Sequence, residues 1–550
     1  MALSTSPRSH RPGQFPVPDI KIRSYFLLPG RQLGDTRGLV ERLRGMDVEV
    51  YRLKKAITVP NARVFGGRSA KNLKVPAGAY WIPLAQPQKH WIQALIGEDP
   101  YVPFPYFYDV SSWSNPLLAG VDTVYTGDRL TPQADRVRRI DGGVGSRPSP
   151  GGAYTYPLDS AAASELTFKL LGRGVALTRD LTTGVVSLPA RAITPDALDR
   201  LARPLGVTVG ERRQPPSGAA LRTPDVGLFG GTGISTTSGS YGEARYVLGS
   251  RWGLHLTPVT TTDINTGTPA FTDRTVLLMP DGSSANAGLT AQGLANLKAW
   301  VEKGGTYVGM RGEGTRVART AGLTSTTEKA PPADYTVIGS HFRVDADTTS
   351  PVALGRPRED FQFNNEDPIL TPTRTGTNVL TYPADDTFWF NGYTVDSDAL
   401  KGTAALVDEP AGAGSAVLFA FDPLFRAYND NGIHLMANAL LAGAPVKKAV
   451  SATPGAGADA LRAAAAKAPV RADLGGEWRP ITVQVAKADL ARTQSVIGRY
   501  TGTAKSAVAG DSAYITIPNP GGLSADEHPF LRDMVRDLHD KGIPLRSLVA

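Results

Sequence analysis

Short apolar runs alternate with segments of helical periodicity over residues 224–441, and this is the clearest pattern in the chain. The run at 225–229 ends in a glycine-rich loop, and the run at 275–279 ends at Pro-Asp-Gly, a turn signal. Between and after such runs, apolar residues recur three or four positions apart, as at Leu294, Leu297 and Val301. Strands alternating with helices predict a parallel α/β sheet, with any ligand site at the carboxyl ends of the strands.

A strand–helix–strand pattern occurs at 24–51 and 153–177, and the same kinds of element return at the C-terminus, as strands at 482–485 and 514–517 and a helix at 524–538. Each unit has strands rich in Val, Ile or Leu and a helix with an apolar face, as in a βαβ crossover that returns to its sheet. We therefore predict an α/β protein of several domains, with smaller βαβ units flanking the main parallel sheet.

Segments rich in glycine and proline mark the predicted domain boundaries, and lids or binding loops commonly lie in insertions. The predicted β-rich insertion of the main domain either overhangs the strand ends in this way or packs as a β excursion without a ligand. We expect a disordered segment at 1–19, α/β units at 20–140 and 151–213, the main domain at 223–445 with its insertion at 325–410, a linker at 446–475 and a small α/β domain at 476–550.

Two strand-to-helix turns of the main domain carry its candidate chemistry. Residues 310–314 read Met-Arg-Gly-Glu-Gly, and 421–424 read Phe-Asp-Pro-Leu. This layout resembles the class I glutamine amidotransferases, in which the first turn holds a nucleophilic cysteine and the second resembles Phe-His-Pro-Glu. The chain contains no cysteine. The resemblance therefore implies a flavodoxin-like, class I amidotransferase-like sheet with a degenerate active site that cannot hydrolyse glutamine.

Carboxylates in these turns leave an alternative open. Glu313 and Asp422 are candidate catalytic residues of a free-standing hydrolase with an amidotransferase-like fold, with Arg311 beside them. The competing interpretation of Arg311 and Glu313 is a local ion pair that shapes the glycine-rich turn.

Three further segments, at 75–87, 108–121 and 416–426, resemble the non-catalytic C-terminal half of large secreted bacterial zinc carboxypeptidases. The resemblance covers residues 20–442 in order. It implies an accessory region that presents peptide or cell-wall substrate to a catalytic domain upstream, outside the cell or at its surface.

The zinc of that family would belong to the upstream domain. The family's metal site needs His-x-x-Glu and a distant histidine, and none of the seven histidines here is followed by glutamate at that spacing. We expect no metal site and no other cofactor in this chain.

Three features could bind a ligand. The loop at Gly231, Thr232 and Gly233 could hold an anion at a helix N-terminus, although it lacks a Walker lysine. The insertion offers polar and aromatic partners that suit a glycan or a peptide, at Asn364, Asn365, Trp389 and Asn391. Aromatic residues from 101 to Trp113 could stack on sugar rings, as in a carbohydrate-binding module, or pack against a neighbouring domain.

The net charge and the lengths of the apolar runs limit the kinds of partner that we expect this chain to bind. The net charge of +8 arises from 59 basic and 51 acidic residues without a concentrated basic run, so we expect a solvated, slightly basic surface and no nucleic-acid partner. No run of about 18 apolar residues occurs, so no membrane span is expected. The first residues lack the apolar core of a signal peptide, and export would depend on sequence upstream of Met1.

Overall fold

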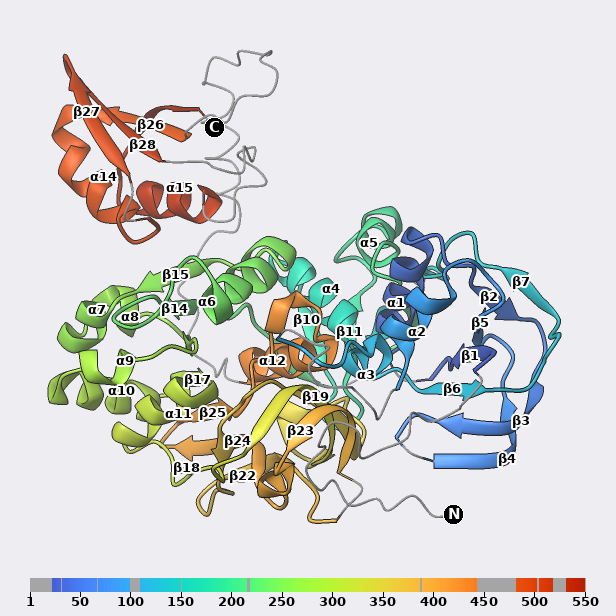
Figure 1. Cartoon of the computed structure of the whole chain (residues 1–550). Coiled ribbons are helices and arrows are strands. Elements are labelled where there is room, and N and C mark those ends of the chain that lie inside the picture. Colours follow the sequence, from blue (N-terminus) through green and yellow to red (C-terminus); the bar gives the residue numbers. More distant parts are fainter. Residues whose placement is uncertain are drawn as a thin grey trace.

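The computed structural model of the chain describes residues 22–30, 32–66, 68–98, 109–149, 151–214, 218–385, 388–442, 481–501, 504–517 and 531–549. The predicted segment 1–19, the predicted linker 446–475 and the aromatic residues at 101–108 lie outside these ranges. Within them, the strands form sheets of seven, six, twelve and four members (Figure 1). The chain is a multidomain α/β protein.

The largest sheet contains a parallel half, as the sequence predicts. Its strands pair in the order β15-β14-β16-β17-β25, all in parallel. This is the flavodoxin-like order, in which strand addition reverses direction between β14 and β16. The strands are β14 (Val226–Phe229), β15 (Leu256–Val259), β16 (Val276–Met279), β17 (Thr306–Met310) and β25 (Gly414–Phe419).

Helices cover both faces of these strands, which is why the strands are apolar along their whole length. In β16, Val276 and Leu278 enter one core, whereas Leu277 and Met279 enter the other. Helices α6 (Gly239–Ala244) and α12 (Asp430–Ala442) contribute to the first core, and α10 (Ala291–Glu302) and α11 (Arg311–Thr320) contribute to the second.

The segment between α11 and β25 continues the same sheet. Strand β24 pairs antiparallel with β25, and β22 and β19 follow it. The insertion is therefore mainly a packed β excursion, although the loop at 364–369 reaches the ends of the parallel strands. Its strands are β18 (Glu328–Lys329), β19 (Thr336–Ala346), β20 (Glu359–Asn364), β21 (Ile369–Leu370), β22 (Thr377–Thr381), β23 (Trp389–Val395) and β24 (Ala404–Ala411).

The three flanking units share one topology. In each, the first two strands of the strand–helix–strand pattern do not pair as in a simple crossover, because a third strand lies antiparallel between them. A fourth strand then pairs with the other side of the first. This is the split βαβ of ferredoxin-like folds, which the apolar pattern alone did not reveal.

The members of each unit follow in chain order. The N-terminal unit has β1 (Ser24–Leu27), α1 (Leu33–Gly45), β2 (Tyr51–Leu53), β5 (Tyr80–Pro83) and β6 (Thr123–Thr126), with the hairpin β3 (Ile57–Val64) and β4 (Arg68–Val75), helices α2 (Lys89–Ile96) and α3 (Asn115–Ala119) and strand β7 (Ala134–Arg136) added. The second has β9 (Ala153–Pro157), α4 (Ala161–Leu171), β10 (Leu177–Arg179), β11 (Val185–Pro189), α5 (Pro195–Ala202) and β12 (Thr208–Arg212), flanked in its sheet by β8 (Gly143–Val144) and β13 (Ala219–Leu221). The C-terminal unit has β26 (Ile481–Ala486), α14 (Leu490–Ile497), β27 (Lys505–Ala509), β28 (Ser512–Ile517), α15 (Leu531–Asp540) and β29 (Leu545–Val549).

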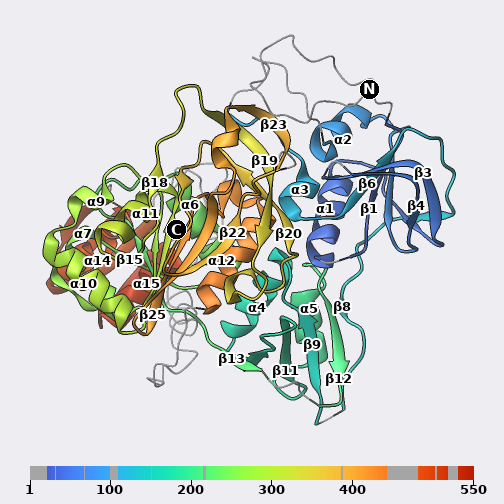
Figure 2. The ribbon, with the colours of Figure 1, turned by 90° about the horizontal axis from the view of Figure 1, so that it is seen from below.

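Polar contacts join the units. Figure 2 shows the N-terminal unit in blue and the second unit in teal beside the insertion and α12. The Asp35 carboxylate accepts hydrogen bonds from the backbone N–H groups of Ala161 and Ala162 at 2.9 Å each, and so caps α4 of the second unit.

Where the structure describes the chain, no helix is long and apolar enough to cross a membrane.

The C-terminal unit contacts the main domain through a charged histidine. His255 Nδ1 lies 2.9 Å from Asp533 Oδ1, and its Nε2 lies 3.3 Å from Asp537 Oδ1 on α15. Burial alone would lower the pKa of His255, but the hydrogen bonds to both carboxylates outweigh burial and raise it to about 9. The imidazole is therefore protonated at neutral pH.

Candidate functional site

Two adjoining hollows of about 380 and 360 Å³ lie where the parallel strands end. Asp281, Gly282, Arg311 and Asp367 line both of them, and we call the combined space the cleft. Asp281 comes shortly after β16 and Arg311 directly after β17. The cleft is therefore at the edge of the sheet where a flavodoxin-like order predicts a ligand site.

A sharp turn from β17 into α11 places Arg311 in the cleft. Arg311 has φ +52°, a left-handed conformation that costs free energy for a residue other than glycine. The turn is so tight that a Cβ at Gly314 would lie 2.7 Å from the backbone of Gly309, which only glycine at position 314 avoids. This geometry is that of a nucleophile elbow. Arg311 thus stands where the resemblance to amidotransferases places the cysteine.

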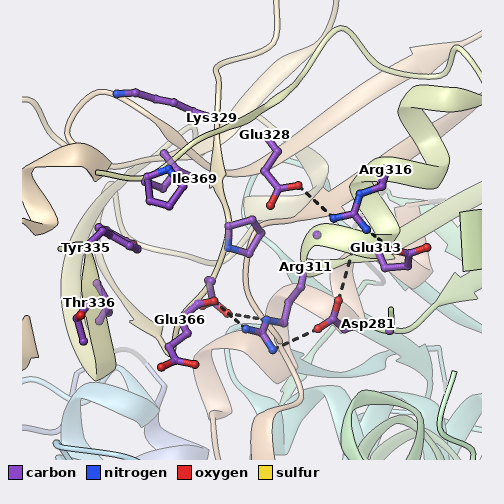
Figure 3. A pocket seen from close by; sticks show the side chains of 16 residues that line it. Asp281, Arg311, Glu313, Arg316, Glu328, Lys329, Tyr335, Thr336, Glu366 and Ile369 are labelled. Carbon is purple, nitrogen blue, oxygen red and sulfur yellow. Dashed lines mark hydrogen bonds and ion pairs between the residues drawn. The ribbon is translucent and has the colours of Figure 1, made fainter. Parts of the chain in front are cut away.

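Four acceptors surround the Arg311 guanidinium, and Figure 3 shows it beside Asp281 and Glu366. Its Nε lies 2.9 Å from Asp367 Oδ1 and its Nη1 lies 3.2 Å from Asp281 Oδ2. Its Nη2 donates to the carbonyl oxygens of Asn365 and Glu366, at 3.1 and 2.9 Å. Burial alone would lower the pKa of Arg311, but the surrounding carboxylates raise it. The guanidinium stays charged and has no lone pair to act as a nucleophile or base.

Burial raises the pKa of three carboxyl groups that line the cleft. Burial is the main cause that raises the pKa of Asp367 to about 7, against the opposing effect of Arg311. Burial, and then the charge of Asp422, raises the pKa of Glu243 to about 8. Burial also raises the pKa of Asp281. Perturbed carboxyl groups in a cleft are typical of functional sites.

Glu313 is buried beneath the cleft. Its Oε1 accepts the backbone N–H of Asn286 at 2.7 Å, and its Oε2 pairs with Arg316 one turn along α11. The side chain of Glu313 is 0% exposed. Three other ion pairs therefore replace the predicted pair between Arg311 and Glu313: Glu313 pairs with Arg316, and Arg311 pairs with both Asp281 and Asp367.

Asp422, just after β25, lines the cleft and is fixed by two donors. Ser240 Oγ donates to its Oδ2 at 2.5 Å, and the Leu424 N–H donates to its Oδ1 at 2.9 Å. Ser238 is the N-cap of α6, and Ser240 lies inside the first turn of this helix with its hydroxyl on Asp422.

The glycine-rich loop is partly occupied by its own neighbours. The N–H of Thr232 donates to Thr261 Oγ1 at 2.8 Å, and Gly231 is packed against the same threonine. Gly233, with φ +76°, lines the cleft. Helix α6 begins only at Gly239, so this loop does not form the N-terminus of a helix as an anion cradle would require.

Three other predicted ligand-binding residues lie apart from the two hollows. Asn391 is 2% exposed, and its Oδ1 lies 2.8 Å from His341 Nδ1 inside the insertion. Trp389 is half-buried on β23. Trp113 is 40% exposed and stacks on Tyr428, with ring centroids 5.7 Å apart. The structure does not bring these three residues together with Arg311.

Sequence reasoning missed several residues of the cleft. Asp281 stands in the Pro-Asp-Gly turn after a predicted strand, so the rule that ligands bind at strand ends would have found it. Asp367 comes from the insertion, and Glu243 lies within α6. No local signal in the sequence marks these two. Asn365, a predicted ligand-binding residue of the insertion, does line the cleft. In the part of the chain that the structure describes, no group of three or more His, Asp or Glu could hold a metal ion.

Comparisons with known proteins give limited similarity. No family model matches the chain, and no curated protein matches it. A protein from Thermoplasma acidophilum that is described as a GMP synthase subunit matches 40% of this chain over 92% of its own length, at 12% identity and a TM-score of 0.27. A glutamine amidotransferase from Thermotoga maritima aligns with 36% of this chain and 76% of its own, at 12% identity and a TM-score of 0.24.

Part of a larger enzyme is similar to the same degree. A β-galactosidase from Bacillus circulans aligns over 40% of this chain, at 12% identity and a TM-score of 0.26, and this covers 31% of the β-galactosidase. TM-scores this low support no statement about activity. The amidotransferase-like description of the main domain rests on its strand order and on the elbow at Arg311.

Proposed function

We propose that this chain is a non-catalytic binding protein whose ligand occupies the cleft at the ends of the parallel strands. The observation that carries the proposal is the position of Arg311. A charged guanidinium, fixed by four acceptors, stands where the amidotransferase resemblance places a nucleophile. Such a group can orient a ligand by hydrogen bonds but cannot attack it.

The resemblance to secreted zinc carboxypeptidases extends this proposal. In this extended proposal, the chain presents peptide or cell-wall material to a hydrolase outside the cell or at the cell surface. An upstream peptidase domain would be the natural partner, and zinc would belong to that domain. This extension rests on the sequence segments at 75–87, 108–121 and 416–426.

Ligand binding to the cleft can be tested with Asn365→Ala. Asn365 lines the cleft, and its buried Oδ1 has no hydrogen-bond partner among the described residues, so its removal should leave the fold intact. Titration calorimetry against peptides, muropeptides and oligosaccharides should identify a ligand that the variant binds more weakly. The matched control is Asn72→Ala, at an exposed asparagine of the β4 strand outside the cleft, which should bind as the native protein does. Equal binding by native protein and Asn365→Ala, or release of ammonia from glutamine by the native protein, would contradict the proposal.

A second function, hydrolysis by a carboxyl pair, has one observation in its favour. Glu243, whose pKa is raised to about 8, interacts with Asp422 in the same hollow, so a protonated carboxyl group stands beside a second carboxyl group at neutral pH. The variants Glu243→Gln and Glu313→Gln separate the two functions. Hydrolysis of a peptide or glycan by native protein that is lost in Glu243→Gln, with the fold retained, would establish the enzyme. Loss only in Glu313→Gln would reflect the support that this buried residue gives to the elbow.

A further inference from the structure

Aromatic rings run from the cleft to the surface of the N-terminal unit. Phe363 and Phe425 line the cleft, with ring centroids 5.1 Å apart. The ring centroids of Phe425 and Tyr428 are 6.1 Å apart. Tyr428 stacks on Trp113, with ring centroids 5.7 Å apart and an interplanar angle of 22°. We call these four residues the aromatic ladder. It joins the cleft to an exposed tryptophan of a different unit.

The last ring of the ladder is held in place and still reaches solvent. Tyr428 stacks on Trp113, and the Arg426 guanidinium carbon lies 5.9 Å from the Trp113 ring centre. Arg426 also pairs with Asp109. Trp113 nevertheless keeps 40% of its surface exposed. A fixed, partly open indole flanked by a carboxylate and a guanidinium can stack on the apolar face of a sugar while polar groups bind its hydroxyls.

The backbone that presents the ladder is strained. Arg426 and Ala427 both have positive φ, +49° and +59°, although neither is glycine. These two residues separate Phe425 from Tyr428 in the chain, so the strained turn sets the positions of two ladder rings. Backbone strain of this kind costs free energy and is concentrated at binding and catalytic sites.

The polar lining at the inner end of the ladder suits a ligand with many hydroxyl groups. Asn365 Oδ1 is a buried acceptor without a hydrogen-bond partner among the described residues, and a ligand donor would satisfy it. Asp422 adds acceptor oxygens, and Ser235 and Ser238 add hydroxyls that both donate and accept. The surplus of carboxyl groups disfavours phosphates and other polyanions.

We propose that the cleft and the aromatic ladder together bind an oligosaccharide, with one end at Asn365 and Asp422 and a pyranose ring stacked on Trp113 at the other. This inference rests on the proposed function, because it names the class of ligand that the cleft takes. A chain of sugars fits the observation that polar and aromatic contacts follow one another from the cleft to the surface.

The experiment is a binding panel of neutral hexasaccharides, built from glucose, N-acetylglucosamine, mannose or galactose, measured by titration calorimetry. The variants are Trp113→Ala, Trp113→Tyr and Asn365→Ala, with melting temperature as a check on folding. Trp91→Ala is the matched control, because Trp91 is 52% exposed on α2 of the same unit and outside the ladder. We expect a bound hexasaccharide whose affinity falls about tenfold in Trp113→Ala, is largely restored in Trp113→Tyr and is unchanged in Trp91→Ala.

The other outcomes separate this inference from the proposed function. If peptides bind in an Asn365-dependent manner and no hexasaccharide does, the saccharide inference is wrong and the binding function stands. If neither panel binds, both are wrong. Hexasaccharide binding that Trp91→Ala weakens as much as Trp113→Ala would indicate unspecific stacking and would also overturn the inference.

Discussion

Two arginine–carboxylate clusters of this protein use the same pairing in opposite surroundings. Arg356 and Asp360 form a bidentate pair at 2.6 and 2.7 Å, with side chains 0% and 2% exposed. Arg356 also donates to Asn431 of α12, whose amide in turn donates to the Leu117 carbonyl of the N-terminal unit. This cluster is closed, and it holds the insertion, α12 and the N-terminal unit together.

The Arg311 cluster is open. Its guanidinium is 27% exposed, lines the cleft and faces more carboxylates than it can neutralise. The charges of the Arg356 pair balance one for one, whereas the pKa values of Asp367 and Glu243 are raised to about 7 and 8. Unbalanced buried charge lowers stability. The closed cluster at Arg356 therefore serves the fold, whereas the open cluster at Arg311 costs stability at the place where we propose a ligand.

Breaking the closed cluster should have the largest effect. Arg356→Ala leaves Asp360 buried without its partner, so the free energy of unfolding should fall by about 3–5 kcal/mol. Urea denaturation followed by tryptophan fluorescence measures this. The control is Arg358→Ala, at an exposed position two residues away, which should change stability by no more than about 0.5 kcal/mol. A similar small change in both variants would show that the pair does not hold the domains together.

The raised pKa of Asp367 in the open cluster should make the stability of the protein depend on pH. Asp367 has a pKa of about 7 in the folded protein against an ordinary value of 3.8, so the folded state keeps this proton while the unfolded state loses it. The contribution of Asp367 to stability should therefore fall as pH rises from about 4 to about 7, by up to about 1.4 kcal/mol per pH unit. The melting temperature of Asp367→Asn relative to the native protein should rise with pH over this range, and that of the exposed Asp334→Asn should not. A constant difference between Asp367→Asn and the native protein would contradict the burial of Asp367.

His255 and its two aspartates form a third cluster. It is closed, like that of Arg356, but its histidine loses its charge as pH rises. Its pKa of about 9, above the ordinary 6.5, means that its stabilising contribution is complete below about pH 6.5 and is lost as pH rises through 9. His255→Gln should release α15 from the main domain at pH 7 at a cost of about 1–3 kcal/mol. Hydrogen exchange of α15 measures this, with the exposed His539→Gln as the control. Unchanged exchange in His255→Gln would show that other contacts dock the unit.

The smallest effect on stability should come from the cleft itself. Asn364→Ala removes a side chain that is 0% exposed, accepts from the Asp367 N–H and donates to Tyr382, so it should cost about 1–3 kcal/mol. Asn365→Ala, the next residue, should stay within about 0.5 kcal/mol of the native protein while weakening ligand binding. Thermal melts of the two variants measure the contrast. Equal destabilisation would mean that Asn365 serves the fold.

Much of the main domain could be predicted because its strands are buried on both faces. Apolar runs such as 275–279 appear as β16 within one residue, and the elbow at 310–314 is visible in the sequence as a strand followed by glycines. Arg311 and Asp422 were found for the same reason, since Arg311 directly follows β17 and Asp422 comes shortly after β25. Local patterns carry this information because burial and turn geometry act on neighbouring residues.

Contacts between distant segments could not be predicted in this way. Asp367 reaches Arg311 only because the insertion folds back along the sheet, and Glu243 meets Asp422 only because α6 packs beside the end of β25. Nothing near Asp367 or Glu243 in the sequence distinguishes them from surface carboxylates. Their raised pKa values arise from burial, which is a property of the assembled domain.

The sequence by itself determined the order of strands and helices, the absence of a thiol nucleophile and the place of Arg311 at a strand end, because periodicity and residue type are local properties. Tertiary structure alone decided that a third strand enters each flanking βαβ unit, that Arg311 pairs with Asp281 and Asp367 rather than Glu313, and that the rings from Phe363 to Trp113 form one ladder. Pairing and burial depend on which distant segments meet, and the free energy of the whole fold selects them.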